Sequence, residues 1–208
     1  MSDIKLKRAL SIRNVLDKKF ERFEFTSDWF DAFGQPQKQG VWFIWGNSGN
    51  GKTSFVLQLM KQLSQYGKVL FNSLEEATDL TLQESYDRLN MIEANGKIDA
   101  VTDNIEEFTL RLSRQKSPKI VVIDSFQYFG LTYAQYKKFK EQFRDKLIVF
   151  ISQADGKNPK GPAADSVMYD AALKIRVEGH RAISKGRYIG PKGYYTIWAE
   201  KAAEYWMD

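Results

Sequence analysis

The sequence predicts an α/β fold in which helices flank a central, mostly parallel β-sheet, with antiparallel edge strands at the C-terminal end. Short apolar runs alternate with amphipathic segments from residue 41 onward, and strands separated by helices favour parallel pairing. Two later segments alternate apolar and polar residues, as half-exposed strands at a sheet edge do. The length of 208 residues suits one such domain, alone or with an arm.

Each expected element has its own pattern. Continuous apolar runs predict buried strands over 41–45, 69–71, 120–124 and 147–151. Helical spacing of apolar residues predicts helices over 54–66, 81–91, 105–112 and 133–143. Alternation predicts half-exposed strands, added antiparallel at one edge, over 173–177 and 194–198. The glycine- and proline-rich stretch 154–165 is expected to be a loop.

Residues 1–30 are expected to form an N-terminal helical arm, and residues 31–208 the core domain. Ile12, Val15, Leu16, Phe20 and Phe23 fall near helical spacing, with basic residues between the apolar positions. Two roles for this arm stay open: a cap over the sheet edge, or a segment that docks on a neighbouring subunit.

Composition narrows the class of protein. With 43% hydrophobic and 27% charged residues, this is an ordinary soluble globular chain without an apolar run of membrane-spanning length. It contains no cysteine, which excludes disulfides and thiolate zinc sites and makes a reducing cytoplasm the expected location. The net charge of +5 permits a polyanionic partner without requiring one.

The most informative motif has the pattern G-x-x-x-x-G-K-S/T and lies between an expected strand and an expected helix. Glycines let backbone N–H groups curl around an anion, and the helix N-terminus adds the positive end of its dipole. Lys52 is expected to reach the outer phosphates of a nucleotide, and the Thr53 hydroxyl to bind Mg²⁺. The expected nucleotide-binding residues of the loop are Gly46, Asn47, Ser48, Gly49, Asn50, Gly51, Lys52, Thr53 and Ser54.

Polar residues follow the other three buried strands, at the sheet edge where ligands bind in open α/β folds. Asp124 follows four apolar residues, and a carboxylate at the edge of a dry core is suited to hydrated Mg²⁺. Glu75 is the candidate for orienting and polarising an attacking water, with Glu76 as the alternate. Gln153 is the candidate for a hydrogen bond to the γ-phosphate, and its loss on hydrolysis would be felt by the loop that follows.

The order of these motifs resembles the RecA-like ATPases and, within them, the bacterial RadA (Sms) and DnaB-type branch. Four segments carry the resemblance: Ser73-Leu74-Glu75-Glu76, Ile123-Asp124-Ser125, Asp155-Gly156 with the downstream Gly161-Pro162 and Asp170, and Lys185-Gly186-Arg187-Tyr188-Ile189-Gly190. The likeness covers about residues 41–198. The last segment departs from the RadA pattern by one extra residue and by Gly186 in place of asparagine.

The resemblance implies an oligomer, a ring (hexameric) or a filament, with ATP at the subunit interfaces. It implies that Lys185 and Arg187 act in trans on the γ-phosphate of a neighbour, where a guanidinium stabilises developing charge. A basic turn with exposed charges is the alternative.

The resemblance also implies contacts to single-stranded DNA from the segments after the third and fourth strands. The expected DNA-binding residues are Lys137, Lys138, Lys157 and Lys160. Solvated lysines on a loop and a helix are the alternative. Arg88 is the candidate for stacking on adenine, or else a surface ion-pair partner.

The leading hypothesis is therefore an ATP-hydrolysing, RecA-like motor that uses Mg²⁺ and binds single-stranded DNA in replication, recombination or repair. A filament-forming recombinase on the same fold is one alternative. A KaiC-like, ATP-dependent switch that acts on a protein partner without DNA is another. A small-molecule kinase would need a lid with arginines, and no segment is an obvious candidate for one.

Overall fold

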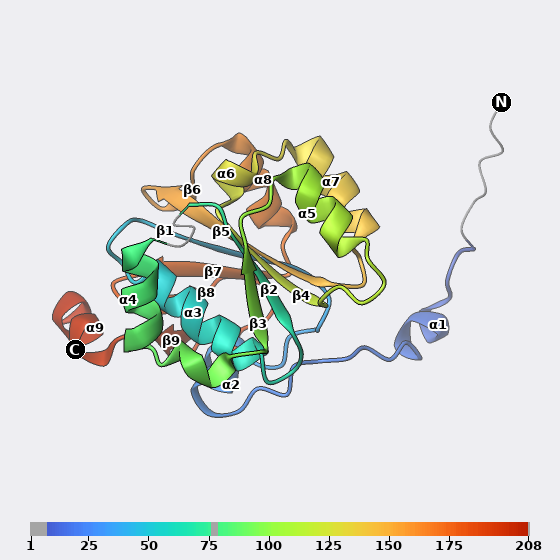
Figure 1. Ribbon diagram of the computed structural model, residues 1–208. Coiled ribbons are helices and arrows are strands. Elements are labelled where there is room, and N and C mark those ends of the chain that lie inside the picture. Colours follow the sequence, from blue (N-terminus) through green and yellow to red (C-terminus); the bar gives the residue numbers. More distant parts are fainter. Residues whose placement is uncertain (1–7, 76–78, 208) are drawn as a thin grey trace.

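The structure, a computed structural model, describes residues 8–75 and 79–207. A sheet of nine strands forms its centre, in the order β3-β2-β4-β5-β1-β7-β8-β9, with the short β6 paired to β5 (Figure 1). The strands are β1 (Gly40–Gly46), β2 (Val69–Ser73), β3 (Ile98–Val101), β4 (Ile120–Asp124), β5 (Leu147–Asp155), β6 (Asn158–Pro159), β7 (Leu173–Glu178), β8 (Arg181–Ser184) and β9 (Tyr194–Thr196).

Strands β3 through β7 in this spatial order pair in parallel, and β8 and β9 are antiparallel additions, which confirms the expected fold class. One detail of the prediction is wrong. The segment 173–177 was expected as an antiparallel edge strand, but β7 runs parallel to β1 and is covered on its other side by β8. Its apolar and polar residues alternate because one face of the strand packs in the core while the other face is half-buried. Alternation therefore indicates how deeply each face is buried, and it does not indicate the direction of the strand.

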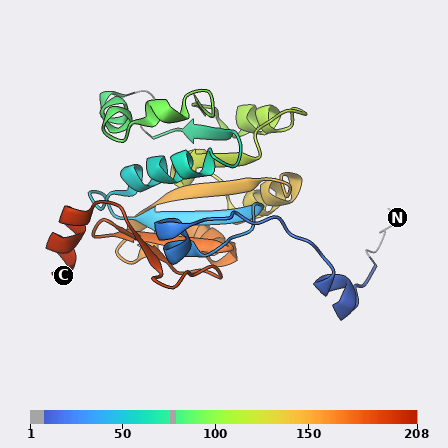
Figure 2. The same cartoon turned by 90° about the horizontal axis from the view of Figure 1, so that it is seen from below.

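Helices cover both faces of the sheet (Figures 1 and 2). On one face lie α2 (Ser27–Phe33), α3 (Lys52–Leu63), α4 (Leu80–Arg88) and the 3₁₀ helix η1 (Met91–Ala94). On the other lie α5 (Ile105–Leu112), α6 (Phe126–Phe129), α7 (Tyr133–Gln142) and α8 (Pro162–Asp170). The C-terminal helix α9 (Ala199–Trp206) lies at the end of the sheet where the parallel strands finish (Figure 1).

Strand β1 explains why the buried strands read as continuous apolar runs. Successive side chains of a strand point to opposite faces. Trp42 and Ile44 therefore pack in the core under α3, while Phe43 and Trp45 pack in the core under α6 and α8. Both faces are dry, so no position along the strand favours a polar residue.

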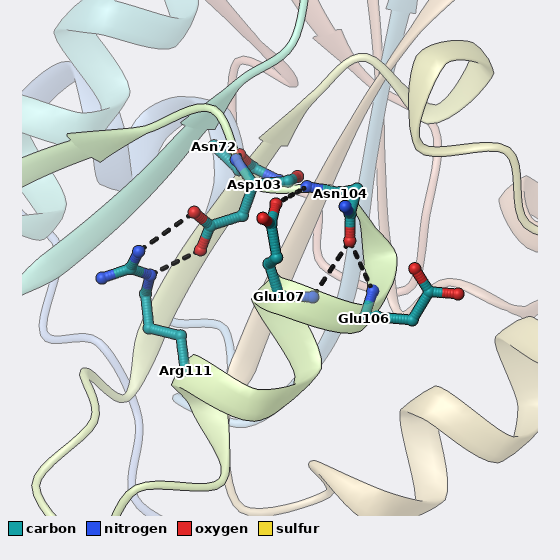
Figure 3. Close-up of polar contacts among 6 residues, drawn as sticks. All are labelled: Asn72, Asp103, Asn104, Glu106, Glu107 and Arg111. Carbon is teal, nitrogen blue, oxygen red and sulfur yellow. Dashed lines mark hydrogen bonds and ion pairs between the residues drawn. The ribbon is translucent and has the colours of Figure 1, made fainter.

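A polar cluster holds the end of β2 against the loop before α5 (Figure 3). Asn72 is fully buried; its Nδ2 donates to the Asp103 carbonyl at 2.9 Å, and the Asp103 N–H donates to its Oδ1 at 2.9 Å. Arg111 donates two hydrogen bonds to the Asp103 carboxylate, at 2.5 and 3.0 Å. Asn104 and Glu107 form a capping box that starts α5. The cluster thereby fixes the strand end from which the loop carrying the candidate catalytic acid leaves.

Some elements differ from those predicted. The helix after the glycine loop begins at Lys52, and the one expected over 81–91 ends at Arg88 and is followed by η1. The expected loop 154–165 is instead the end of β5, a tight hairpin to β6, and the start of α8 at Pro162. Strands β3 and β8 and helices α2 and α9 were not anticipated. In residues 8–75 and 79–207, no helix has both the length and the apolar character needed to cross a bilayer.

The N-terminal segment divides into two parts. Helix α1 (Ile12–Leu16) buries none of its residues and lies away from the body (Figures 1 and 2). The helical pattern expected to continue through Phe20 and Phe23 is wrong, because the helix ends at Leu16. Phe23 and Phe25 are buried beside Trp42, and α2 packs in the same cluster. The described part that stands apart is therefore 8–20, and the division of the chain at residue 30 stays a prediction.

Candidate nucleotide-binding site

The glycine loop joins β1 to α3 through backbone conformations that favour glycine. Gly49 and Gly51 have φ of +78° and +89°, and α3 begins directly after Gly51 at Lys52. Gly46 lies close to β7, where a Cβ would meet the Val177 carbonyl oxygen at 2.4 Å. The first-turn amides of a helix have no intrahelical acceptor, so the loop and α3 together present donors suited to an anion.

A cavity of about 490 Å³ opens beside this loop. Its phosphate end, as we call it, is lined by Ser48, Gly49, Gly51, Lys52, Thr53, Ser54, Glu75 and Asp124. The rest of the lining, which we call the open end, comes from Gln58, Arg88, Leu89, Ile151, His180, Ile197 and Trp198. The volume is within the range of small-molecule sites, about 300–1,000 Å³.

Strand register brings the predicted acids to the phosphate end. Ser73 pairs with Asp124 across β2 and β4, and the N–H of Glu75 donates to the Asp124 carbonyl at 3.2 Å. Asp124 and Thr53 line the same cavity as Lys52. Glu76 lies outside the described residues.

The donor set at this end fits Mg²⁺ held together with a nucleotide. Mg²⁺ is usually bound by one or two protein oxygens, with phosphates and waters completing the octahedron. Thr53 and Asp124 supply one hydroxyl and one carboxylate. In the described part of the chain, no group of three or more histidine, cysteine or acidic residues forms a metal cage. The site is therefore suited to a nucleotide-borne cation and not to a metal held by protein alone.

Gln153 connects the cavity to the hairpin that follows β5. Its Nε2 donates to Glu75 Oε1 at 3.2 Å, and its Oε1 accepts from Lys160 Nζ at 3.4 Å. Its backbone is held as well, because its N–H donates to Gln127 Oε1 at 3.2 Å and its carbonyl accepts from the Lys160 N–H at 2.9 Å. A change at Glu75 can thus reach Lys160 through one side chain. Gln153 is not among the described residues that line the cavity, so its hydrogen bond to the γ-phosphate stays a prediction.

The hairpin also contacts the glycine loop directly. Trp45 Nε1 donates to the Lys157 carbonyl at 3.0 Å, and Asn47 Nδ2 donates to the Gly156 carbonyl at 3.1 Å. The turn between β5 and β6 is therefore hydrogen-bonded to the start of the glycine loop. Through Gln153 it is also connected to Glu75.

The open end is built by segments from three parts of the chain. Arg88, at the end of α4, donates to Ser54 Oγ at 3.1 Å and lines the cavity, whereas its stacking on adenine stays a prediction. The turn between β7 and β8 packs on the loop, since the N–H groups of Gly179 and His180 donate to Asn50, to Oδ1 at 2.7 Å and to the carbonyl at 3.2 Å. The N–H of Ile197 donates to the carbonyl of His180 at 2.9 Å.

Sequence reasoning missed His180, Ile197 and Trp198 as lining residues. No local motif marks them, and the only hint is the single histidine in an alternating segment. Trp198 is 43% exposed. Its ring packs edge-on against the ring of His180, with 6.0 Å between the two ring centroids. A large, half-exposed aromatic at the mouth of a cavity is a suitable surface for a planar base.

Lys185 and Arg187 follow β8 and are exposed, and neither is among the described residues that line the cavity of their own chain. Their backbones are fixed on β7, because the N–H of Lys185 donates to the Lys174 carbonyl and that of Arg187 to the Ala172 carbonyl. Gly186 has a physical reason to replace asparagine, since a Cβ there would lie 2.8 Å from the Ala172 carbonyl oxygen.

The four lysines predicted to bind DNA are exposed and lie on two elements. Lys137 and Lys138 are on α7, where Lys137 Nζ lies 5.1 Å from the centre of the Tyr133 ring. Lys157 and Lys160 are on the β5–β6 hairpin, which contacts the cavity as described above. Their role in DNA binding stays a prediction.

The sheet order, the glycine loop and the acids at the strand ends define a RecA-like P-loop fold. No protein-family model matches the chain, and no curated protein sequence matches it. Solved structures do. The KaiC-like protein PH0186 from the hyperthermophilic archaeon Pyrococcus horikoshii OT3 matches at 18% identity with a TM-score of 0.58, covering 80% of this chain and 93% of that one.

The flagellar accessory protein FlaH from Methanocaldococcus jannaschii matches at 14% identity with a TM-score of 0.57, covering 85% of this chain and 92% of that one. At such identities the likeness shows the fold alone. The finer resemblance to the RadA and DnaB-type branch stays a prediction.

Proposed function

We propose that the protein is a Mg²⁺-dependent ATPase that assembles into a ring or filament and couples ATP hydrolysis to binding of single-stranded DNA. The observation that carries the proposal is the meeting of Lys52, Thr53, Glu75 and Asp124 in one cavity at the phosphate loop. A P-loop alone binds phosphate, whereas an acid at the far side of the cavity adds a group that can act on water.

Each residue has a role set by its charge and position. Lys52, at the first turn of α3, offsets the charge of the outer phosphates. Thr53 and Asp124 would hold Mg²⁺, which neutralises phosphate charge when it is bound. Glu75 orients the attacking water and accepts its proton, and Gln153 keeps the Glu75 carboxylate in place through their 3.2 Å hydrogen bond.

The position of Lys185 and Arg187 supports the assembly part of the proposal. Both are exposed on the segment after β8, outside the cavity of their own chain, so they are available to the cavity of a neighbour. An arginine that reaches the γ-phosphate of another subunit stabilises charge in the transition state. Turnover would then require contact between copies.

The hairpin with Lys157 and Lys160 supports the DNA half of the proposal. Exposed lysines neutralise backbone phosphates, and this pair is joined to the nucleotide cavity through Gln153 and Asn47. A filament-forming recombinase would use the same contacts. Electron microscopy of the ATP-bound form distinguishes the two, because a motor of this kind closes into a ring and a recombinase extends as an open helix.

A switch that acts on a protein partner is the second candidate. The likeness to a KaiC-like protein favours it at the level of fold. In that case the hairpin would meet a protein, and DNA would leave turnover unchanged.

The test measures ATP turnover with and without single-stranded DNA over a salt series, with Lys52→Ala as the blank. We expect stimulation by DNA and an affinity for DNA that falls steeply as salt rises. The variant Lys157→Ala/Lys160→Ala should lose that stimulation, whereas Lys97→Ala/Lys116→Ala, at exposed lysines on other segments, should keep it. An oligomeric ATPase without DNA binding at low salt would favour the switch. No turnover under any condition would overturn the ATPase itself.

A further inference from the structure

Asn50 joins the glycine loop to the turn between β7 and β8. Its Oδ1 accepts from the Gly179 N–H at 2.7 Å, and its carbonyl accepts from the His180 N–H at 3.2 Å. Its Nδ2 donates to the Ser48 carbonyl at 3.2 Å, within the loop. The pattern G-x-x-x-x-G-K-S/T leaves this position open, so phosphate binding by itself does not require asparagine here. One side chain therefore both shapes the loop and anchors it to a segment far along the chain.

The turn that holds Asn50 is short and well defined. β7 ends at Glu178 and β8 begins at Arg181, which leaves two residues to reverse the chain. These residues, Gly179 and His180, have φ of +51° and +56°, and a type I′ hairpin turn uses positive φ at both positions. The paired strands on either side fix this turn, so its two N–H groups are held where Asn50 meets them.

Helix α9 packs on the same turn. Trp206 Nε1 donates to the Gly179 carbonyl at 3.0 Å, so the N–H of Gly179 bonds to the loop and its carbonyl bonds to α9. A Cβ on Gly179 would lie 2.1 Å from the Tyr205 ring, which shows how closely the helix approaches. The Arg181 guanidinium lies 5.2 Å from the centre of the Trp206 ring. The glycine loop, the turn and α9 thus form one chain of contacts.

The beginning of α9 is attached to the nucleotide cavity as well. Trp198, just before the helix, lines the open end. The neighbouring Ile197 donates its N–H to the His180 carbonyl at 2.9 Å, and its carbonyl accepts from Gln58 Nε2 at 3.3 Å. Gln58 belongs to α3, the helix that follows the glycine loop. Both ends of α9 are therefore connected to the loop and the helix that bind phosphate.

The contacts that hold α9 are few and lie near the surface. Ala202 is the one buried residue of this helix, whose eight residues are all described. A helix of eight residues is marginal alone in water, so its stability comes from the contacts it makes with the body. Segments with little buried apolar area open locally at a low free-energy cost. Docking of α9 is thus an equilibrium that a ligand at the glycine loop can shift.

We propose that Asn50 is a positioning residue that couples the docking of α9 to the binding of a triphosphate. The inference rests on the proposed nucleotide site and adds a means of regulating it. When α9 is docked, the turn holds Asn50 and the glycine loop keeps the shape that accepts phosphate. When α9 is undocked, the turn and the loop lose this support. By linkage, a ligand that favours the held loop stabilises the docked helix by the same factor.

The first experiment measures equilibrium binding of ATP and of inorganic tripolyphosphate to the full chain. Asn50→Ala removes two side-chain hydrogen bonds and should weaken both ligands by about 5- to 30-fold. Trp206→Phe removes the donor to Gly179 but keeps an aromatic ring, and should weaken both by about 2- to 5-fold. Lys201→Ala, which breaks only an ion pair within α9, is the matched control and should bind as wild type does.

A double variant distinguishes this role from a general effect on the fold. None of the three substituted positions is buried, and thermal unfolding checks that each variant is folded at the assay temperature. If Trp206 acts on the loop through Gly179 and Asn50, Trp206→Phe should cost little further affinity in protein that already carries Asn50→Ala. Two independent effects would multiply. Multiplied losses, or an Asn50→Ala variant that binds as tightly as wild type, would overturn the proposal.

Hydrogen exchange tests the reciprocal effect. Saturating tripolyphosphate should slow exchange of the α9 amides several-fold in wild type, and most of this protection should be lost in saturated Asn50→Ala protein. Tripolyphosphate has no base, so protection cannot come from stacking on Trp198. Exchange in α9 that does not respond to saturation of wild type would contradict the coupling alone. Wild type that binds neither ATP nor tripolyphosphate would contradict the proposed nucleotide site, and the coupling with it.

Discussion

The two ends of the nucleotide cavity are built in different ways. The phosphate end comes from one contiguous motif and from residues at the ends of neighbouring strands, such as Glu75 and Asp124. The open end is assembled from the end of α4, the β7–β8 turn and the residues after β9, which bring Arg88, His180 and Trp198 together. Binding phosphate needs a backbone shape that a short motif specifies, whereas enclosing a base needs surfaces that only tertiary packing brings together.

This contrast separates two properties of the site. The phosphate end is expected to determine whether a triphosphate is bound and hydrolysed. The open end is expected to determine which base is preferred. Substitutions at the two ends should therefore have effects that differ in kind as well as in size.

The largest effect is expected for Glu75→Gln. The substitution keeps the shape and a hydrogen-bonding oxygen for Gln153 but removes the group that accepts a proton from water. We expect turnover to fall by roughly 10²- to 10⁴-fold with ATP affinity nearly unchanged. Single-turnover hydrolysis and equilibrium binding measure the two quantities. Full turnover would transfer the role to another acid, Glu76 first.

Lys52→Ala should weaken ATP binding by about 10- to 100-fold, because a charged contact to the outer phosphates is lost. Inorganic tripolyphosphate should lose affinity in parallel, since it contacts the same end. Lys61→Ala, on the same helix but paired with Glu93 outside the cavity, is the matched control and should bind normally. Equal weakening by both variants would mean that the helix, not the ammonium group, was disturbed.

Trp198→Ala should lower ATP affinity by about 2- to 10-fold through loss of an aromatic surface for the base. Tripolyphosphate binding should not change, and this difference is what separates the two ends. Tyr169→Ala, at an exposed tyrosine on α8, serves as the control. If Trp198→Ala weakened tripolyphosphate as much as ATP, the open end would not be a base site.

The smallest effect on the site is expected for Asn72→Ala, which acts on stability. It leaves the buried N–H and carbonyl of Asp103 without their partner, at a cost of about 1–3 kcal/mol. Thermal unfolding should shift by several degrees, at roughly 2–4 °C per kcal/mol. Asn95→Ala, at an exposed turn, should leave the unfolding temperature within a degree of wild type.

The fold was predictable where pattern and burial coincide. Strands such as β4 are buried on both faces, so continuous apolar runs in the sequence predict them. The glycine loop predicts a strand before it and a helix after it, and these are β1 and α3. β3 was not predicted because Asp99 and Ala100 are exposed at the sheet edge, and the pattern there reads as polar. The 154–165 stretch was misjudged because glycine and proline also occur in a tight hairpin and at a helix start.

The candidate site was predictable to a similar extent. Lys52, Thr53, Glu75 and Asp124 come together because parallel strands end at one edge. His180 and Trp198 could not be found in this way, since their approach depends on the hydrogen bonds of the β7–β8 turn to Asn50. Lys185 and Arg187 are exposed and lie outside the cavity of their own chain, and their action on the nucleotide of another copy stays a prediction.

The central claim is that ATP is held by the glycine loop of one copy and completed by Arg187 of another. The most direct test mixes Lys52→Ala with Arg187→Ala and measures ATP turnover, each variant being inactive alone. Random mixing pairs an intact glycine loop with an intact Arg187 at about one interface in four, so partial turnover should return. Turnover that stays at the level of the single variants at every mixing ratio would contradict a shared site.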